Sequence, residues 1–181
     1  MRFSKHRVGA SLGIAILIAI GAAEWWVHRL QKRVDDIERV WEGKASDTEL
    51  VNFLASNDKI LLSNTLTELE HRRVVGGRDS AAKLLTDPDI HVWYCAGLYL
   101  GCLGDKRSIP CLIRGLDHPA WRSRPRVVEY LKSMTGQDFG EEKQAWVAWW
   151  SAQNNNEKFD FSWDKTQQLG PTNGSPIRLR P

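Results

Sequence analysis

The feature that most constrains the fold of this chain is an internal repeat of 31 residues. The segments beginning at Leu54, Leu85 and Leu116 align at this spacing. A single helix hairpin of this size cannot bury its apolar face, so such units stack side by side. The sequence therefore predicts an all-α fold, a short α-α superhelix of about three helix pairs plus a cap. The register continues through three matched sets: Leu62, Trp93 and Arg124; Thr65, Ala96 and Val127; Leu69, Leu100 and Leu131.

The first unit carries start and stop signals for two helices. Ser46 and Glu49 have the S-x-x-E spacing of a capping box, so a helix is expected over ELVNFLA. Asp58 is expected to begin the second helix, DKILLSNTLTELEHRRVV. Gly76 and Gly77 are expected to end it, because glycine tolerates the left-handed backbone that follows many helices.

The next two units follow the same plan. Asp79 is expected to cap the helix SAAKLL. Asp87 and Pro88 are expected to open the helix DIHVWYCAGLYLGCL, with Pro88 near its first turn. The helix SIPCLIRGL follows, and a further helix is expected to run to Met134 and stop at Gly136. Pro125 falls where a helix interior would be expected, so WRSRP is predicted to be a loop or kink before RVVEYLKSM.

The loop within LYLGCLGDKRSIP raises the question of a phosphate site. A phosphate-binding loop requires G-x-x-x-x-G-K-[ST] after a strand, and this loop has another spacing and follows a helix. Gly101 and Gly104 supply the backbone freedom that a turn needs. Asp105 or Ser108 can cap the next helix, with Pro110 in its first turn. The loop is therefore interpreted as a corner between two helices.

Two stretches carry a resemblance to a known family. LLTDPDIHVWYCAGLYLGCLGDKRSIPCLIRGLDHP resembles a HEAT repeat of the short bacterial type, which also occurs in phycobilin lyases. LKSMTGQDFGEEKQAWVAWW resembles the closing module of many bacterial HEAT-repeat proteins, so Trp146, Trp149 and Trp150 are expected to form a C-terminal cap. The resemblance covers about residues 46–152 and departs from the family at Trp93, where an arginine is common. It implies an α-solenoid that binds proteins.

The N-terminal 44 residues are expected to hold a membrane anchor and a helical stalk. Residues 8–23 carry no charge, and residues 8–27 are long enough to cross a bilayer as one transmembrane helix. Trp25 and Trp26 would then lie at the membrane interface. The alternative is a signal peptide cleaved before Glu24, which would leave a secreted or periplasmic protein.

The residues in and around this span predict its orientation in the membrane, its contact with a second span and the helix that follows it. Short N-terminal tails usually stay inside, so a single-pass protein with the bulk of the chain outside the cytoplasm is expected. Gly9 and Gly13 form one GxxxG spacing, which allows a weak homodimer between two spans. Beyond the span, apolar residues at helical spacing predict a stalk helix that ends near Gly43: Leu30, Val34, Ile37 and Trp41.

Charge argues against a nucleic-acid partner. The excess of basic residues lies in the first 44 residues, whereas residues 45–152 carry thirteen Lys and Arg against fourteen Asp and Glu. A domain that binds duplex DNA usually has a net basic surface. The remaining basic candidates for binding a protein partner are Lys83, Arg107, Arg114, Arg122 and Arg124, of which Lys83 and Arg114 occupy the same repeat position.

Catalytic and metal-binding constellations are not evident in the sequence. His91, Cys95 and Cys102 do not have the spacing of a zinc site, and the cysteines are interpreted as buried thiols. Carboxylate pairs at 68/70 and 141/142 are interpreted as solvated helix faces or as charges at helix starts. No cofactor is expected, and no enzymatic activity.

These observations combine into one function and its alternatives. The sequence predicts a membrane-anchored, non-enzymatic HEAT-repeat scaffold for protein–protein interaction, with repeats at 45–152 and a disordered tail at 153–181. HEAT-like repeats also occur in bilin lyases and in alkylpurine DNA glycosylases, so an enzyme-associated protein of either kind is the alternative. A fold alone does not decide between them.

Overall fold

The computed structural model describes residues 5–118 and 124–153, with side chains from residue 20 onward among them. Every regular element in these residues is helical. The chain divides into two units, Met1–Ala45 and Ser46–Pro181. The predicted disordered tail lies outside the described residues except for Gln153, which ends the last helix.

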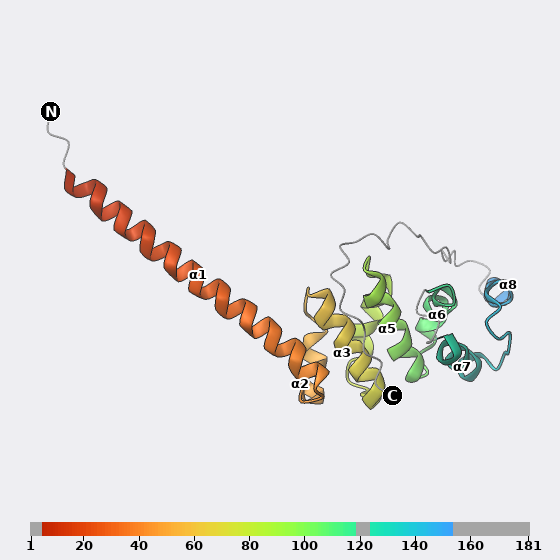
Figure 1. The fold of residues 1–181 in the computed structure, drawn as a ribbon. Helices are drawn as coiled ribbons and strands as arrows, with labels where there is room; N and C mark the ends of the chain where they lie inside the picture. Colours follow the sequence, from red (N-terminus) through yellow and green to blue (C-terminus); the bar gives the residue numbers. More distant parts are fainter. Residues whose placement is uncertain (1–4, 119–123, 154–181) are drawn as a thin grey trace. The chain divides into compact units, whose positions relative to one another are not determined.

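The first unit is a single long helix, α1 (Lys5–Trp41), drawn from red to orange in Figure 1. After it, Gly43 has a left-handed backbone (φ 68°), and the Lys44 amide donates to the carbonyl oxygen of Arg39 at 2.8 Å. The helix predicted from Leu30 onward and its end near Gly43 are therefore confirmed.

Most of the predicted span at 8–27 consists of residues whose side chains lie outside the described part of the chain, and so do Gly9 and Gly13. In the residues that are described, no helix is both long enough and apolar enough to cross a membrane.

In the second unit α3 packs against α5, and α5 packs against α6 and α7 (Figure 1). α6 also packs against α7 and α8. α2 and α4 each pack against the helix that follows in the chain. The elements are α2 (Asp47–Phe53), α3 (Lys59–Arg72), α4 (Arg78–Lys83), the 3₁₀ turn η1 (Leu84–Thr86), α5 (Ile90–Cys102), the 3₁₀ turn η2 (Lys106–Ser108), α6 (Ile109–Gly115), α7 (Arg124–Thr135) and α8 (Lys143–Gln153).

Helix starts recur at the predicted spacing. The Asp58 carboxylate accepts hydrogen bonds from the first backbone amides of α3, and the Asp89 carboxylate does the same for α5. Both aspartates have an extended backbone, and they are 31 residues apart. At the start of α2, Ser46 and Glu49 form the predicted capping box in both directions. These caps satisfy amide groups that would otherwise lack partners within the helix.

Helix ends recur at the same spacing. Arg73 after α3 and Gly104 after α5 both have left-handed backbones, with φ of 55° and 68°. The amide of the next residue in each case reaches back to a helix carbonyl, from Val74 to Leu69 at 3.1 Å and from Asp105 to Leu100 at 2.9 Å. The two ends are therefore the same C-terminal motif. The prediction that Gly76 and Gly77 end α3 was wrong, because the chain already turns at Arg73.

One predicted start was also misplaced. Gly77, not Asp79, occupies the cap position of α4, and Asp79 lies in its first turn. The helix expected over SAAKLL ends at Lys83 and continues as η1. The start of α5 agrees with the prediction, since Asp89 is the cap and Pro88 lies directly before it, near the first turn. Asp87 is extended, as a residue preceding proline prefers to be.

The third 31-residue repeat ends as predicted. Gly136 (φ 73°) follows α7, which stops at Thr135. Pro125 lies in the first turn of α7, where its missing N–H costs little. Residues 119–123, which include most of the predicted WRSRP loop, lie outside the described residues.

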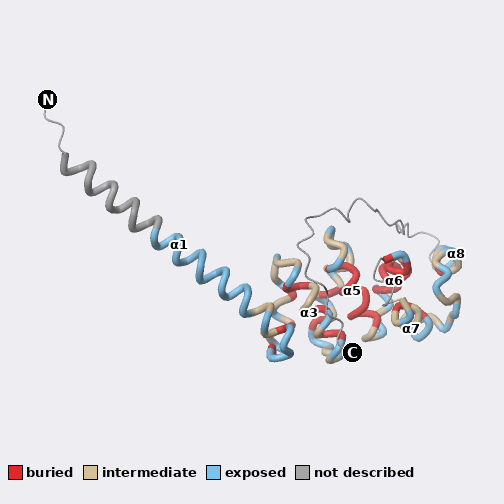
Figure 2. The backbone as a smooth tube through the Cα atoms, viewed as in Figure 1, coloured by how far each residue is buried: buried red, intermediate tan, exposed pale blue. Residues whose placement is uncertain are grey.

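The repeat positions form the core of the second unit. Eight of the nine matched residues are at most 1% exposed; the exception is Arg124, which is partly buried. Figure 2 shows buried residues along α3, α5 and α6, whereas the residues in the described part of α1 are mostly exposed. Along α5 every residue from Val92 to Gly101 is buried. A helix that is apolar on all sides is expected to lie inside a fold, with neighbours all around.

Trp146 fixes the last helix to the turn before it. Its indole is fully buried, lies edge-on to Phe139 at 4.9 Å between ring centroids, and donates a hydrogen bond to the Gly140 carbonyl at 2.8 Å. Trp149 and Trp150 are partly buried against the same core. The three tryptophans therefore pack at the C-terminal end of the described helices, as the sequence predicts.

The strained end of α3 gives a stability prediction. Replacing Arg73 by glycine removes the steric cost of a left-handed conformation and should stabilise the fold by ~1 kcal/mol, net of glycine's greater freedom when unfolded. The matched control is Gly104→Ala, at the equivalent repeat position, where an added Cβ meets no atom within 4 Å and only backbone strain is introduced. That variant should lose a similar amount. Urea unfolding followed by tryptophan fluorescence measures both, and a lower midpoint for Arg73→Gly would contradict the account.

Candidate partner-binding surface

The loop between α5 and α6 is held in place by the Asp105 carboxylate. This carboxylate caps η2 by accepting from the Arg107 amide, and it pairs with the Arg107 guanidinium at 2.7 Å. Arg78 from α4 approaches the same carboxylate at 3.8 Å. The hydrogen bonds from Arg107 lower the pKa of Asp105. Asp105, rather than Ser108, therefore caps the turn, and the loop is a corner whose arginine, Arg107, faces carboxylates of the protein.

Arg107, a predicted binding residue, is held by two carboxylates. Besides Asp105, its guanidinium donates to Asp79 of α4 at 3.0 Å. These hydrogen bonds raise the pKa of Arg107. Because the side chain is about half exposed, the pairs contribute little to stability, but they fix the direction of the guanidinium.

Lys83 and Arg114 occupy the same repeat position but have different surroundings. Lys83 is exposed at the end of α4. Arg114 is partly buried, and its guanidinium carbon lies 4.5 Å from the centroid of the Trp93 ring, a cation–π contact. The residue matched to Trp93 one repeat earlier is Leu62, which offers no aromatic face. A shared repeat position therefore does not produce a uniform stripe of free cations.

The remaining predicted residues lie on or near α7. Arg124 approaches Glu141 at 3.8 Å, which makes a weak pair between α7 and the segment before α8. Arg122 lies outside the described residues. Glu141 and Glu142 are exposed, as predicted. Among the described residues, Lys83 at the end of α4 and Lys106 at the start of η2 are exposed lysines.

The predicted membrane-interface tryptophans belong to the first unit. Trp25 and Trp26 are both exposed on α1. The guanidinium of Arg29 lies over the Trp25 ring at 5.1 Å from its centroid.

Glu70 was wrongly interpreted from the sequence as part of a solvated face. It is only 6% exposed, accepts a hydrogen bond from the Tyr130 hydroxyl at 2.9 Å, and pairs with Arg126 at 3.3 Å. Burial raises the pKa of Glu70, although Arg126 and Tyr130 oppose this shift. Its neighbour Glu68 does behave as an outer-face residue and pairs with Arg72 one turn on. Local spacing gave no sign of this difference, because the partners of Glu70 lie on α7.

The cysteines are mostly buried. Cys95 and Cys111 are buried as predicted, whereas Cys102 is partly exposed. Burial raises their pKa values, to about 11 for Cys95 and Cys102 and about 12 for Cys111, so they remain protonated thiols. Within the described residues, no three His, Cys, Asp or Glu side chains gather as metal ligands do.

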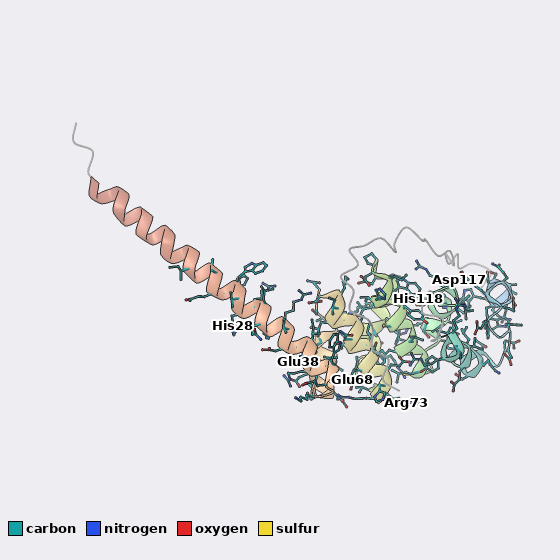
Figure 3. All side chains as sticks on the ribbon, viewed as in Figure 1. His28, Glu38, Glu68, Arg73, Asp117 and His118 are labelled. Atoms are coloured by element: carbon teal, nitrogen blue, oxygen red, sulfur yellow. The ribbon has the colours of Figure 1, made fainter. Side chains whose placement is uncertain are left out.

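His118, which follows α6 (Figure 3), was not singled out by the sequence. It is 3% exposed and stacks on the Tyr94 ring, with centroids 4.0 Å apart and planes nearly parallel. Trp93 lies edge-on to it at 6.3 Å. Burial, with smaller effects from His91 and Arg124, lowers the pKa of His118 to about 4. The imidazole is therefore neutral at physiological pH and packs as an aromatic ring.

Comparison with known proteins leaves the family open. No family model, curated protein or solved structure matches this chain. The resemblance to HEAT repeats therefore rests on the motifs within residues 46–152, and it stays a prediction.

The buried His118 gives a pH prediction. Its pKa is lower in the folded state than the usual value of about 6.5, so the unfolded chain binds the proton first. Stability should therefore fall as the pH is lowered from about 6.5 towards 4, by roughly 2–3 kcal/mol in total. The measurement is urea unfolding at several pH values, for the wild type and for His118→Phe, which keeps an aromatic ring without a titrating group.

The comparison of the wild type with His118→Phe is necessary because the pKa of Glu70 is also shifted in the folded protein. Its raised pKa has the opposite effect, because protonation favours the folded state as the pH falls. Subtracting the His118→Phe curve from the wild-type curve isolates the histidine. Two curves with the same slope between pH 7 and 5 would refute the role of His118.

Proposed function

We propose that this chain is a membrane-anchored, non-enzymatic HEAT-repeat scaffold that binds a protein partner. The observation that carries the proposal is the recurrence of the same helix start, the same helix end and the same buried positions at 31-residue spacing. Stacked units of this kind place equivalent surface positions in rows, and such rows form the extended binding surfaces of repeat proteins.

The chemistry of the second unit supports binding rather than reaction. Its buried acid, Glu70, is held by Tyr130 and Arg126 between two helices, which is a structural arrangement. Its described thiols have raised pKa values and are poor nucleophiles. The near-neutral net charge of residues 45–152 argues against a duplex-binding enzyme such as a DNA glycosylase.

The membrane attachment is proposed from the first unit. Residues 8–27 would span the bilayer, with Trp25 and Trp26 at the lipid interface and the second unit held outside the cytoplasm. The exposure of both tryptophans on a helix that runs on into the stalk supports this placement. The partner surface would be the basic set Lys83, Arg107, Arg114, Arg122 and Arg124.

Alkaline carbonate extraction tests the anchor. We expect the full-length protein to stay in the membrane pellet, because a spanning helix is not released when peripheral contacts are broken. A variant without residues 1–29 should move to the supernatant and serves as the control. Release of the full-length chain would refute the anchor, and a mature N-terminus at Glu24 would identify the secreted alternative instead.

Site-specific photo-crosslinking in native membranes tests the partner surface. A photoreactive residue at Lys83 should give a discrete crosslinked product, whereas one at Glu129, which is exposed on α7, should not. Charge reversal of the exposed Lys83 and Lys106 should reduce the yield, because complementary charge favours association. Arg107 and Arg114 are less suitable for reversal, since each also holds an internal contact.

Two outcomes would contradict the scaffold proposal. Equal products from both positions would mean that no particular surface binds a partner. Binding of a tetrapyrrole or of DNA by the purified protein would favour the lyase-like or glycosylase-like alternative.

A further inference from the structure

An apolar stripe runs along the described part of α1. Its larger members, Ile20, Val27, Leu30, Val34 and Trp41, are between 41% and 66% exposed. Ala23 is exposed as well, and Ile37 is partly buried. Soluble single chains rarely leave a continuous apolar surface of this length uncovered.

The stripe has a heptad period. Successive members are separated alternately by three and four residues from Ile20 to Trp41, which is three heptads. Ile20, Val27, Val34 and Trp41 occupy the a positions, and Ala23, Leu30 and Ile37 the d positions. A spacing of 3.5 residues keeps such a seam on one side of a helix and is the signature of a coiled coil.

We propose that residues 20–41 form a parallel two-stranded coiled coil with a second copy of this chain. Three of the four a positions are β-branched Ile or Val, and Leu30 occupies the central d position. β-Branched residues at a combined with Leu at d favour dimers over larger bundles. The proposal does not depend on membrane attachment or on the partner surface of the second unit.

Charges beside the seam support a parallel pair. Arg33 occupies a g position and Glu38 (Figure 3) the e position of the next heptad. In a parallel dimer each g residue faces the following e residue of the other chain, so Arg33 and Glu38 would pair twice by symmetry. An antiparallel pair centred on the stripe would instead set Glu24 opposite Glu38, which brings like charges together.

The same register extends towards the start of α1. Counted backwards along the helix, Gly13 falls at a and Gly9 at d. The GxxxG spacing predicted for close approach of two spans is therefore in phase with the stripe. Trp25 and Trp26 fall at f and g, outside the seam, so their proposed contact with lipid is compatible with dimerisation.

Cysteine crosslinking of the full-length protein in intact cells tests the seam. Leu30→Cys and Val34→Cys, at d and a, should form a disulfide-linked dimer of twice the 20.6 kDa chain mass under mild oxidation. Lys32→Cys at f and Asp35→Cys at b should not, because those positions face away from the partner. The unsubstituted chain, whose cysteines are buried or partly buried, sets the background.

Charge exchange tests the orientation. In the Val34→Cys background, Arg33→Glu or Glu38→Arg alone should lower the dimer yield, and the two together should restore it. Lys32→Glu at the outer f position is the matched control and should leave the yield unchanged.

Several outcomes would overturn the proposal. One is equal crosslinking at all four cysteine positions; another is a monomer mass for the purified chain at every concentration in sedimentation equilibrium. A third concerns labelling of the seam cysteines with a water-soluble maleimide. If phosphatidylcholine vesicles protect these cysteines from the maleimide and no dimer forms, the stripe contacts lipid instead of a second copy. None of these outcomes bears on the crosslink predicted from Lys83, so the two proposals fail separately.

Discussion

The second unit depends on the complete burial of α5. From Val92 to Gly101 this helix has no exposed face, so other helices must cover it on every side. α3, α4, α6 and α7 do so. The close approach is possible because the helix carries glycine at two contact points. A Cβ on Gly97 would lie 2.7 Å from the Cys111 sulfur, and one on Gly101 would lie 2.9 Å from the Tyr130 ring. Side chains there would push α6 and α7 away from α5 and open the core, at a cost typical of overpacked sites.

Charged residues of this unit mostly hold its helices together rather than forming one basic surface. Arg107 joins η2 to α4 through Asp79, and Arg126 joins α7 to α3 through the buried Glu70. Removing one partner of a buried pair is costly because it leaves an uncompensated charge. A basic residue of a repeat protein is therefore a good candidate for partner binding when it is exposed, as Lys83 is, and a weaker one when an internal contact already holds it.

The two units deal with apolar surface differently. The second unit buries its matched positions within its own chain, through helices that pack in succession. The described part of α1 keeps most of its apolar stripe exposed, and a long helix can bury such a stripe only against something outside itself. The heptad spacing and the charges at Arg33 and Glu38 favour a second copy as that partner.

The sequence by itself determined the all-helical class, the 31-residue spacing and several helix boundaries. Ser46, Asp58 and Gly136 could be assigned because a cap or a helix end depends on backbone groups within a few residues. Only the tertiary structure decided the burial of Glu70, whose hydrogen-bond partner Tyr130 is 60 residues away, and the different surroundings of Lys83 and Arg114. Desolvation depends on which helices cover a side chain, and that is a property of the packed fold that local spacing does not contain.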